Sequence, residues 1–503
     1  MKYKLLVATL LCGLSLSSNA QILDIYYRGS IAQIKGKNAD NMTWTANGTH
    51  VKVKSLQAER PLTLILHGQS DNGTISVSCP AGVRVELDNL HLTSQEGAPL
   101  NFKKQTKVEL VARKETVNEL TVVSCVDTVK NHSSVIFCKD DLTISGKGTL
   151  SLLAQGDGCK GINVKANLTI QDISLSVRTM GENRSVDTTM AFTFGGGGPM
   201  GPPPGFDVRG TNHPPFGMNS DSIPEEVQQH FERIRQRFES IAVDTTRRGF
   251  PHDIGGNPMG MGMPLGKHKY IGTPKGIKAK GCVKIESGSV YVSTAKDRGE
   301  GIEGKAGVII NGGKVVVDAI DDGINSGGSI HFNGGFTTVI SRKNDAVDAN
   351  GQIEGAITIA GGTVFAFSQA GPPEEGVDCD FSPIVVKGGT LFSIGAGMGE
   401  MPSVPTAETA QQPTALLIGL NTKEGEFVAV CDSVNGKTLF TFTAPFDFER
   451  SSSLISCPHF HEGCTYIVRS STSEHALPLT SPFTIIGRSS DRFTPGGFPP
   501  FFF

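Results

Sequence analysis

Residues 298–317 read RGEGIEGKAGVIINGGKVVV, and this stretch decides the fold because the chain repeats it. Further copies read DDGINSGGSIHFNGGFTTVI (321–340), NDAVDANGQIEGAITIAGGTVFAF (344–367) and EEGVDCDFSPIVVKGGTLFSI (374–394), and a weaker copy, PKGIKAKGCVKIESGSVYVS (274–293), precedes them. Each copy contains an acidic turn, a Gly-Ile-like step, a short strand, a Gly-Gly pair and a second strand. A repeat of this length that is built from strands predicts a solenoid of stacked coils.

The apolar residue of each Gly-Ile-like step marks the length of one coil. These residues are Ile277, Ile302, Ile324, Val347 and Val377, at intervals of 25, 22, 23 and 30 residues. Alternate residues within a copy are apolar, as in strands that turn one face inward. No copy has the apolar spacing near 3.6 that a helical solenoid requires. We therefore predict an all-β protein built around a three-sided parallel β-helix.

The composition along the chain predicts six regions. They are a signal peptide (1–20), an N-terminal β region with the first coils (21–189), a Gly/Pro/Met-rich insertion (190–268), further coils (269–400), a small C-terminal β cap (401–490) and an irregular tail (491–503). The insertion contains one predicted amphipathic helix at about 222–241, with a capping box at Ser222 and Glu225. This helix is either a lid on the solenoid or a contact for a protein partner or a second copy.

Lys2 and Lys4 precede an apolar run at 5–16, which is typical of a secretion signal. The run is too short to span a bilayer, so we expect an exported protein in the periplasm, on the cell surface or outside the cell. The net charge of -3 excludes a strongly basic nucleic-acid binder. Cys457 and Cys464 flank PHFHEG and are candidates for a disulfide, with two free thiols as the alternative.

Stacking the copies brings their acidic residues into columns. Glu300, Asp322, Asp345 and Glu375 precede the Gly-Ile-like step, Asp321 lies one residue earlier, and Glu303, Asp348 and Asp378 follow the step. Carboxylates on coils roughly 4.8 Å apart repel by about 1 kcal/mol in water and about 3 kcal/mol near a protein surface. Either their pKa values are raised or a cation lies between them. Ca²⁺ fits best, because it accepts six to eight oxygen ligands in loose geometry, and solvated turns are the alternative.

A second column points outward after each Gly-Gly pair. It contains Tyr291, Phe365 and Phe392, whose rings either stack on sugars or lie under a covering element. Arg342 and Lys343 follow an acidic turn and are the basic candidates for contact with an acidic sugar. Their alternative role is to offset the charge of the turn. These five residues form the predicted ligand set.

The repeats DDLTISGKGTL (140–150), DDGINSGGSIHFNGG and NDAVDANGQIEGAITIAGGTV resemble a bacterial carbohydrate-binding β-helix family known for binding polygalacturonate. The resemblance covers roughly residues 45–470. It implies a right-handed parallel β-helix similar to that of pectate lyases, and bound Ca²⁺. The acidic-turn motif of the family falls on Asp321, Asp322, Asp345 and Asp348. The copies at 297–303 and 374–378 depart from it because glutamate replaces aspartate there.

Three functions remain open at this point. The first is a non-catalytic exported protein that binds acidic polysaccharide through Ca²⁺. The second is a calcium-dependent polysaccharide lyase with Arg298, Arg342 or Lys343 as the base, and the third is a surface structural or adhesion protein. A catalytic arginine needs a strongly lowered pKa, which nothing in the sequence indicates. We therefore assign no catalytic residue and favour the binding protein.

Overall fold

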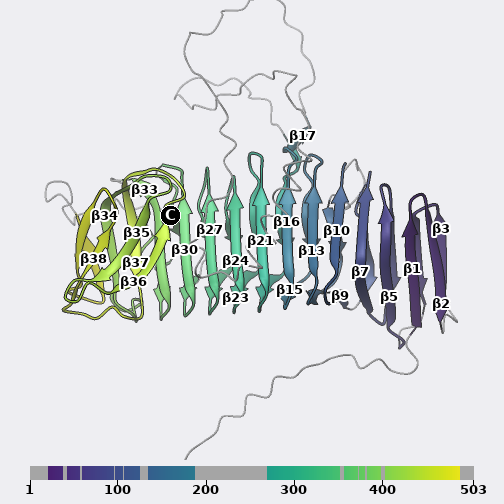
Figure 1. The fold of residues 1–503 in the computed structure, drawn as a ribbon, viewed down its shortest axis with the longest axis horizontal. Coiled ribbons are helices and arrows are strands. Elements are labelled where there is room, and N and C mark those ends of the chain that lie inside the picture. The colour runs from purple at the N-terminus through teal and green to yellow at the C-terminus, as the bar shows by residue number, and fades with distance from the viewer. Residues whose placement is uncertain are drawn as a thin grey trace, which may run out of the picture.

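A computed structural model describes residues 21–37, 42–56, 59–95, 97–105, 107–124, 134–186, 269–351, 356–371, 373–379, 382–397 and 403–487. Within these ranges the chain forms strands and no helix, which confirms the all-β prediction. The whole 190–268 insertion with its predicted helix at about 222–241, the predicted signal peptide and the tail lie outside the described residues. Figure 1 shows the strands as parallel rungs along one long axis.

Between residues 100 and 397, each coil contributes one strand to each of three faces. The β14 face is an 11-stranded sheet: β3 (Met42–Asn47), β4 (His50–Ser55), β6 (Thr74–Cys79), β8 (Leu100–Gln105), β11 (Ser134–Cys138), β14 (Lys160–Val164), β19 (Lys275–Ala279), β22 (Glu300–Gly304), β25 (Ile324–Ser326), β28 (Val347–Ala349) and β31 (Val377–Asp378). The β15 face contains β9 (Val108–Ala112), β12 (Leu142–Gly146), β15 (Leu168–Gln171), β20 (Cys282–Ile285), β23 (Gly307–Ile310), β26 (Ser329–Phe332), β29 (Ile357–Ile359) and β32 (Val385–Val386). The β16 face contains β10 (Val117–Val122), β13 (Thr149–Ala154), β16 (Ser174–Thr179), β21 (Ser289–Thr294), β24 (Lys314–Ala319), β27 (Phe336–Ser341), β30 (Thr363–Ser368) and β33 (Thr390–Gly397).

The core lies inside the coils, where equivalent apolar residues stack. Ile277, Ile302, Ile324, Val347 and Val377 pair in parallel register from coil to coil, and each is at most 3% exposed. The repeat phase predicted from the sequence is therefore confirmed. The right-handed winding implied by the family resemblance stays a prediction.

Glycines occupy two sharp corners in most coils. At Gly323 a Cβ would overlap the Val339 side chain and the Ala346 carbonyl, so a side chain does not fit at this turn, whereas the next coil has Ala346 at the equivalent position. Gly335, in a Gly-Gly pair, has φ 79°, a conformation that other residues rarely adopt. The two glycine positions of the repeat thus solve two different steric problems.

Antiparallel hairpins close the N-terminal end. β1 (Gln21–Arg28) pairs with β2 (Ile31–Lys37), and β3 pairs with β4. β5 (Leu62–Ser70) and β7 (Val83–Ser94) then begin the parallel stack. The described residues before 135 therefore contain both capping hairpins and the first coils.

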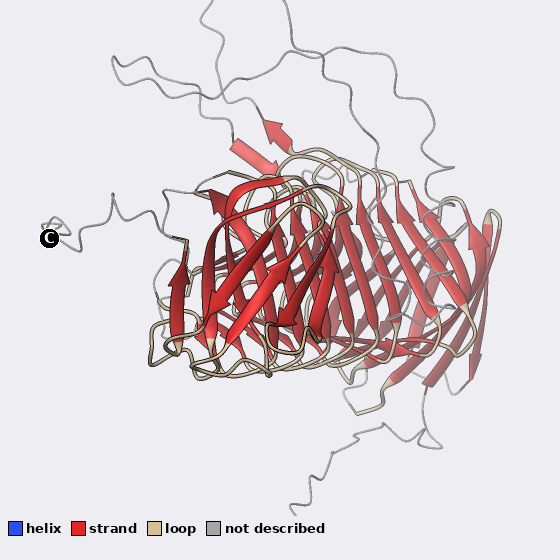
Figure 2. Ribbon diagram, turned by 60° about the vertical axis from the view of Figure 1, so that its left-hand side comes forward, coloured by secondary structure: helices blue, strands red, loops and turns tan. Residues whose placement is uncertain are grey.

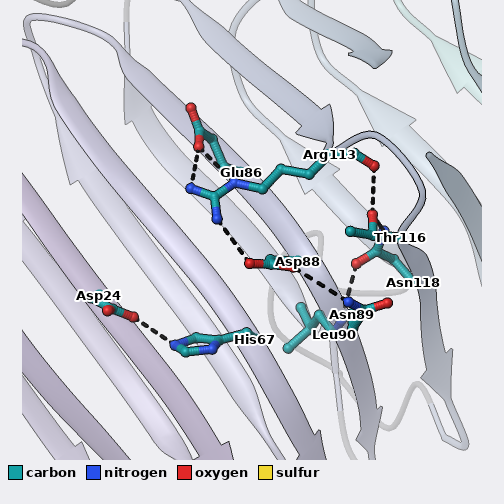
Figure 3. A network of polar contacts seen from close by, with 9 residues as sticks. All are labelled: Asp24, His67, Glu86, Asp88, Asn89, Leu90, Arg113, Thr116 and Asn118. Carbon is teal, nitrogen blue, oxygen red and sulfur yellow. Dashed lines mark hydrogen bonds and ion pairs between the residues drawn. The ribbon is translucent and has the colours of Figure 1, made fainter. Parts of the chain in front are cut away.

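Polar side chains tie these first coils together on their outer surface (Figure 3). The Arg113 guanidinium donates to Glu86 at 2.7 Å and to Asp88 at 2.8 Å, joining neighbouring strands. The buried Asn118 side chain accepts the N–H of Leu90 at 3.0 Å and donates to the carbonyl of Thr149 at 3.0 Å. A fully hydrogen-bonded buried amide of this kind fixes the register of three successive coils.

Strands after residue 403 cover the C-terminal end of the stack, in front in Figure 2. β34 (Thr414–Thr422), β37 (Phe448–Ser456) and β40 (Phe483–Ile486) extend the β16 face, with β37 antiparallel to β33. β35 (Phe427–Asp432), β36 (Thr438–Thr443), β38 (Thr465–Arg469) and β39 (Glu474–Pro478) form a separate 4-stranded sheet. We call all seven strands the cap. One further pair, β17 (Arg184–Val186) with β18 (Lys269–Gly272), joins the chain on either side of the insertion.

Seven of the ten cysteines are free thiols in the described residues. Cys457 and Cys464 are free thiols, so the disulfide considered between them is absent. Cys159 is disulfide-bonded. In the part of the chain that the structure describes, we find no helix with the length and apolarity to cross a membrane.

Candidate functional site

The acidic residues form two adjacent columns along one edge of the β14 face. In the first column Glu300, Asp322, Asp345 and Glu375 lie above one another, because the N–H groups of Gly301, Gly323 and Ala346 bond to the carbonyls of Asp322, Asp345 and Glu375. In the second column Glu303 pairs with Asn325, Asn325 with Asp348, and Asp348 with Asp378. The stacking predicted from the repeat is therefore present in the structure.

The two glutamates at the start of the columns are neutralised by lysines. Lys275, on the preceding coil, lies 2.6 Å from Glu300 and 2.7 Å from Glu303. Lys278 and Lys305 each lie 2.5 Å from Glu303. Burial raises the pKa of Glu303, but these three lysines outweigh it and lower the pKa to about 2. Glu300 and Glu303 thus belong to an ion-pair cluster, and their assignment as metal ligands has no support from this geometry.

Asp322 and Asp345, one and two coils further along, have the opposite character. They are 6% and 8% exposed, and no lysine or arginine pairs with either of them within the described residues. Burial, together with neighbouring carboxyl groups, raises the pKa of Asp322 to about 8 and that of Asp345 to about 9. Asp322 accepts a hydrogen bond from Asn325 at 2.7 Å through Oδ2, whereas its buried Oδ1 has no partner.

The remaining acidic residues are hydrogen-bonded from several sides. Asp348 accepts from the amides of Asn325 at 3.1 Å and Asn350 at 2.7 Å. Asp378 and Glu375 accept from the hydroxyl and the N–H of Ser403, at 2.8 and 2.5 Å. Asp321 lies in the outer position of the turn and accepts from the Asn344 amide at 3.0 Å. Carboxylate and amide oxygens of four further residues therefore surround Asp322 and Asp345: Asn325, Asp348, Asp378 and Glu375. We call all six residues the acidic ladder.

The side-chain oxygens of the acidic ladder are suitable ligands for a hard cation. Its members are carboxylate and amide oxygens, which Ca²⁺ prefers, and no sulfur or imidazole ligand is among them. The unpartnered Oδ1 of Asp322 is available as a ligand. Nevertheless, the described side chains include no group of three or more His, Cys, Asp or Glu already arranged around a metal position. Binding would therefore require side-chain rotation and loss of the protons on Asp322 and Asp345.

The outward aromatic column is present, but the cap covers it. Tyr291, Val316, Thr338, Phe365 and Phe392 pair in register across the β16 face. Phe365 and Phe392 are 5% and 0% exposed, and the ring centroids of Phe392 and Phe442 of the cap are 4.1 Å apart. The prediction that these two phenylalanines stack on sugar rings is wrong, because a second hydrophobic core occupies that face.

Arg342, Lys343 and Tyr291 have structural partners. The Arg342 guanidinium donates two hydrogen bonds to Asp318, at 3.0 and 2.9 Å, and lies 5.3 Å from the ring centre of Phe446 in the cap. Lys343 pairs with Asp297 at 2.6 Å on the surface. Tyr291 is half-buried, and burial raises its pKa to about 12. None of the three points to a ligand, and Arg342 instead helps to seat the cap.

Sequence reasoning missed the lysines that neutralise Glu300 and Glu303. The weaker copy, PKGIKAKG, contains the sequence feature that indicates these ion pairs. In it, Lys275 and Lys278 occupy the two positions that are acidic in the other copies of the repeat. Stacking that copy against the next one predicts the ion pairs directly.

Comparison with known proteins now adds to this geometry. Residues 48–197 and 271–421 match the family model described as carbohydrate-binding domain-containing protein, which together is more than half of the chain. The chain belongs to this family. No curated protein matches it. A solved structure titled as a polysaccharide lyase-like protein from C. thermocellum, gadolinium derivative, is 15% identical, with 76% of this chain and 98% of that chain covered and a TM-score of 0.36.

Proposed function

We propose that this carbohydrate-binding family member is an exported, non-catalytic protein that binds acidic polysaccharide through Ca²⁺ held in the acidic ladder. The observation that carries the proposal is the buried stack of Asp322 and Asp345, whose carboxyl groups have no basic partner within the described residues. A divalent cation offsets the repulsion in such a stack. A cation with incomplete protein coordination also accepts carboxylate oxygens from a uronic acid.

Two further observations support parts of the proposal. Disulfides persist in oxidising compartments, so the bonded Cys159 favours export. The candidate bases of a lyase are engaged elsewhere, since Arg342 is held by Asp318 and Lys343 by Asp297. Proton abstraction requires a base beside the bound uronate, and these pairings favour binding over cleavage.

The test is calorimetric titration of the full chain with CaCl₂ and then with oligogalacturonate. We expect Ca²⁺ to bind with release of protons at pH 7, and oligogalacturonate to bind more tightly once Ca²⁺ is present. The Asp322→Asn/Asp345→Asn variant should lose both effects. A Glu286→Gln variant, which alters a surface pair with Lys284, serves as the control. Calcium-independent binding of neutral glucans alone would contradict the proposal, and ultraviolet-absorbing unsaturated products would establish the lyase instead.

A further inference from the structure

Five lysines lie in register on the β14 face, beside the acidic ladder but nearer the N-terminus. They are Lys103, Lys139, Lys165, Lys280 and Lys305; Lys103 lies within β8, and each of the other four directly follows the strand of its own coil. The N–H groups of Lys139, Lys165, Lys280 and Lys305 bond to the carbonyls of the preceding coil, at Phe102, Cys138, Val164 and Ala279. These lysines therefore stack on five successive coils, β8, β11, β14, β19 and β22, and we call them the lysine column.

The lysine column is accessible and largely without counter-charge. Lys165 is half-buried and the other four side chains are exposed. Within the described residues, only Lys305 forms an ion pair, at 2.5 Å from Glu303. The Lys165 ammonium lies over the Phe137 ring, 5.7 Å from its centre. Burial lowers the pKa of Lys165, and the positive charges of Lys280 and Lys278 lower it further.

A solvated surface does not require this arrangement. Scattered lysines keep a protein soluble, whereas lysines stacked roughly 4.8 Å apart repel and favour the unfolded chain. On the first coils, by contrast, outward charges of opposite sign pair with one another, as in the Arg84, Glu86 and Arg113 network. On the next two coils the equivalent positions are Gly327 and Asn350, so the positive charge ends where the acidic ladder begins. A row of cations with one spacing is complementary to a polymer with one negative charge per unit.

We propose that the lysine column binds the carboxylates of an acidic polysaccharide that lies along the solenoid axis. This inference rests on the proposed function in its choice of ligand, but it assigns different residues and requires no metal ion. Lysine ammonium groups contact carboxylates as mobile point charges, so the column tolerates changes in sugar identity provided that the charge repeats. Binding at the column should therefore be sensitive to salt and insensitive to chelators.

The experiment measures the affinity of the full chain for polygalacturonate in EDTA, at several salt concentrations. The variant is Lys165→Gln/Lys280→Gln, which removes two adjacent charges and keeps side chains of similar length. The control is Lys147→Gln/Lys437→Gln, which changes the net charge equally at two exposed lysines outside the column. We expect the column variant to bind at least tenfold more weakly, with a shallower salt dependence, and to melt at the same or a higher temperature. The control should bind like the wild type.

Equal affinity of the column variant and the wild type in EDTA would overturn the inference. So would equal losses in the column variant and the control, because net charge alone would then explain binding. If the wild type binds polygalacturonate only with Ca²⁺, and both lysine variants bind it with the same affinity as the wild type, the proposed role of the acidic ladder is supported and that of the lysine column is refuted. If the wild type binds polygalacturonate equally in EDTA and in Ca²⁺, the column variant loses that binding and the Asp322→Asn/Asp345→Asn variant keeps it, the column stands and the calcium-dependent proposed function fails.

Discussion

Asp322 and Asp345 are close enough along one edge of the coil that both cannot be ionised without cost. Their raised pKa values, about 8 and about 9, mean that both carboxyl groups are protonated at neutral pH in the metal-free protein. The folded state therefore holds these protons more tightly than the unfolded state, in which aspartate titrates near 3.9. The resulting stability is complete below pH 4 and is lost as the pH rises through about 8 to 9.

This linkage predicts a pH-dependent melting temperature. In EDTA, the wild type should lose at least about 2 °C in apparent Tm between pH 5 and pH 9 relative to the Asp322→Asn/Asp345→Asn variant. The variant cannot ionise at these positions, so its profile should be flatter. Differential scanning fluorimetry over that pH range checks the difference. Parallel profiles for the two proteins would show that the carboxyl groups titrate normally.

Glu303 shows the opposite linkage at a neighbouring position. Three lysines hold its pKa at about 2 against the effect of burial, so its contribution to stability is present above pH 4.5 and is lost as the pH falls toward 2. Glu303→Gln leaves Lys275, Lys278 and Lys305 around a neutral amide. We expect a loss of about 3–5 kcal/mol in the free energy of unfolding at pH 7.

Chemical denaturation at pH 7 measures this loss. The matched control is Glu286→Gln, which breaks a single, more exposed pair with Lys284 and should cost less than about 1 kcal/mol. A similar small loss of stability for both substitutions would mean that the lysines around Glu303 are fully hydrated and that their ion pairs with Glu303 contribute little to the free energy of unfolding.

At the scale of elements, the cap covers the C-terminal end of the β16 face of the solenoid. Phe365, Phe367 and Phe392 of the coils pack against Phe442 and Phe448 of the cap in one hydrophobic cluster. Those strands would otherwise expose aromatic side chains to water at the end of the β16 face. The cap therefore removes the C-terminal end of the β16 face from ligand binding, whereas the charged columns lie on the β14 face.

Phe392→Ala tests the attachment of the cap. The side chain is fully buried, so its removal should cost about 3–5 kcal/mol and increase hydrogen exchange in β35, β36 and β38 more than in β14 or β19. Phe427→Ala, on the exposed side of β35, should have little effect on either measurement. If exchange instead increased evenly over all coils, the cap and the solenoid would unfold as one unit.

The repeat made the coils predictable, and the cap lies beyond what a repeat can show. The spacing of Ile302, Ile324 and Val347 sets the phase of the stack, and register follows because a shift would turn these residues outward. Burial of Phe392 depends on strands with no repeat, docked from 50 residues further along the chain, so sequence periodicity carries no information on it. The pairing of Lys275 with Glu303 was harder to predict than the coils but easier than the cap, because it follows from the repeat only after the weaker copy is aligned with the others.

Across the whole molecule, the β14 face changes sign along the axis. The lysine column covers the coils from β8 to β22, about 20 Å at roughly 4.8 Å per coil, and the acidic ladder continues from β25 to β31. A polyanion that follows the axis would meet attraction on the first part and repulsion on the second. Under the proposed function, calcium bound in the acidic ladder would reverse that repulsion, and one polymer would then be held over both parts.

This arrangement predicts that the effect of Ca²⁺ depends on the length of the ligand. A short oligogalacturonate can occupy the lysine column alone, and its affinity in EDTA and in Ca²⁺ should agree within about twofold. A chain long enough to reach β31 should gain at least about tenfold with Ca²⁺, equivalent to about 1.4 kcal/mol, because it adds contacts at the acidic ladder. In the Asp322→Asn/Asp345→Asn variant the long chain should lose that gain, while the short chain binds as before. Titration of a length series with both proteins measures this, and an equal calcium effect at every length would place the cation and the lysines at one shared site.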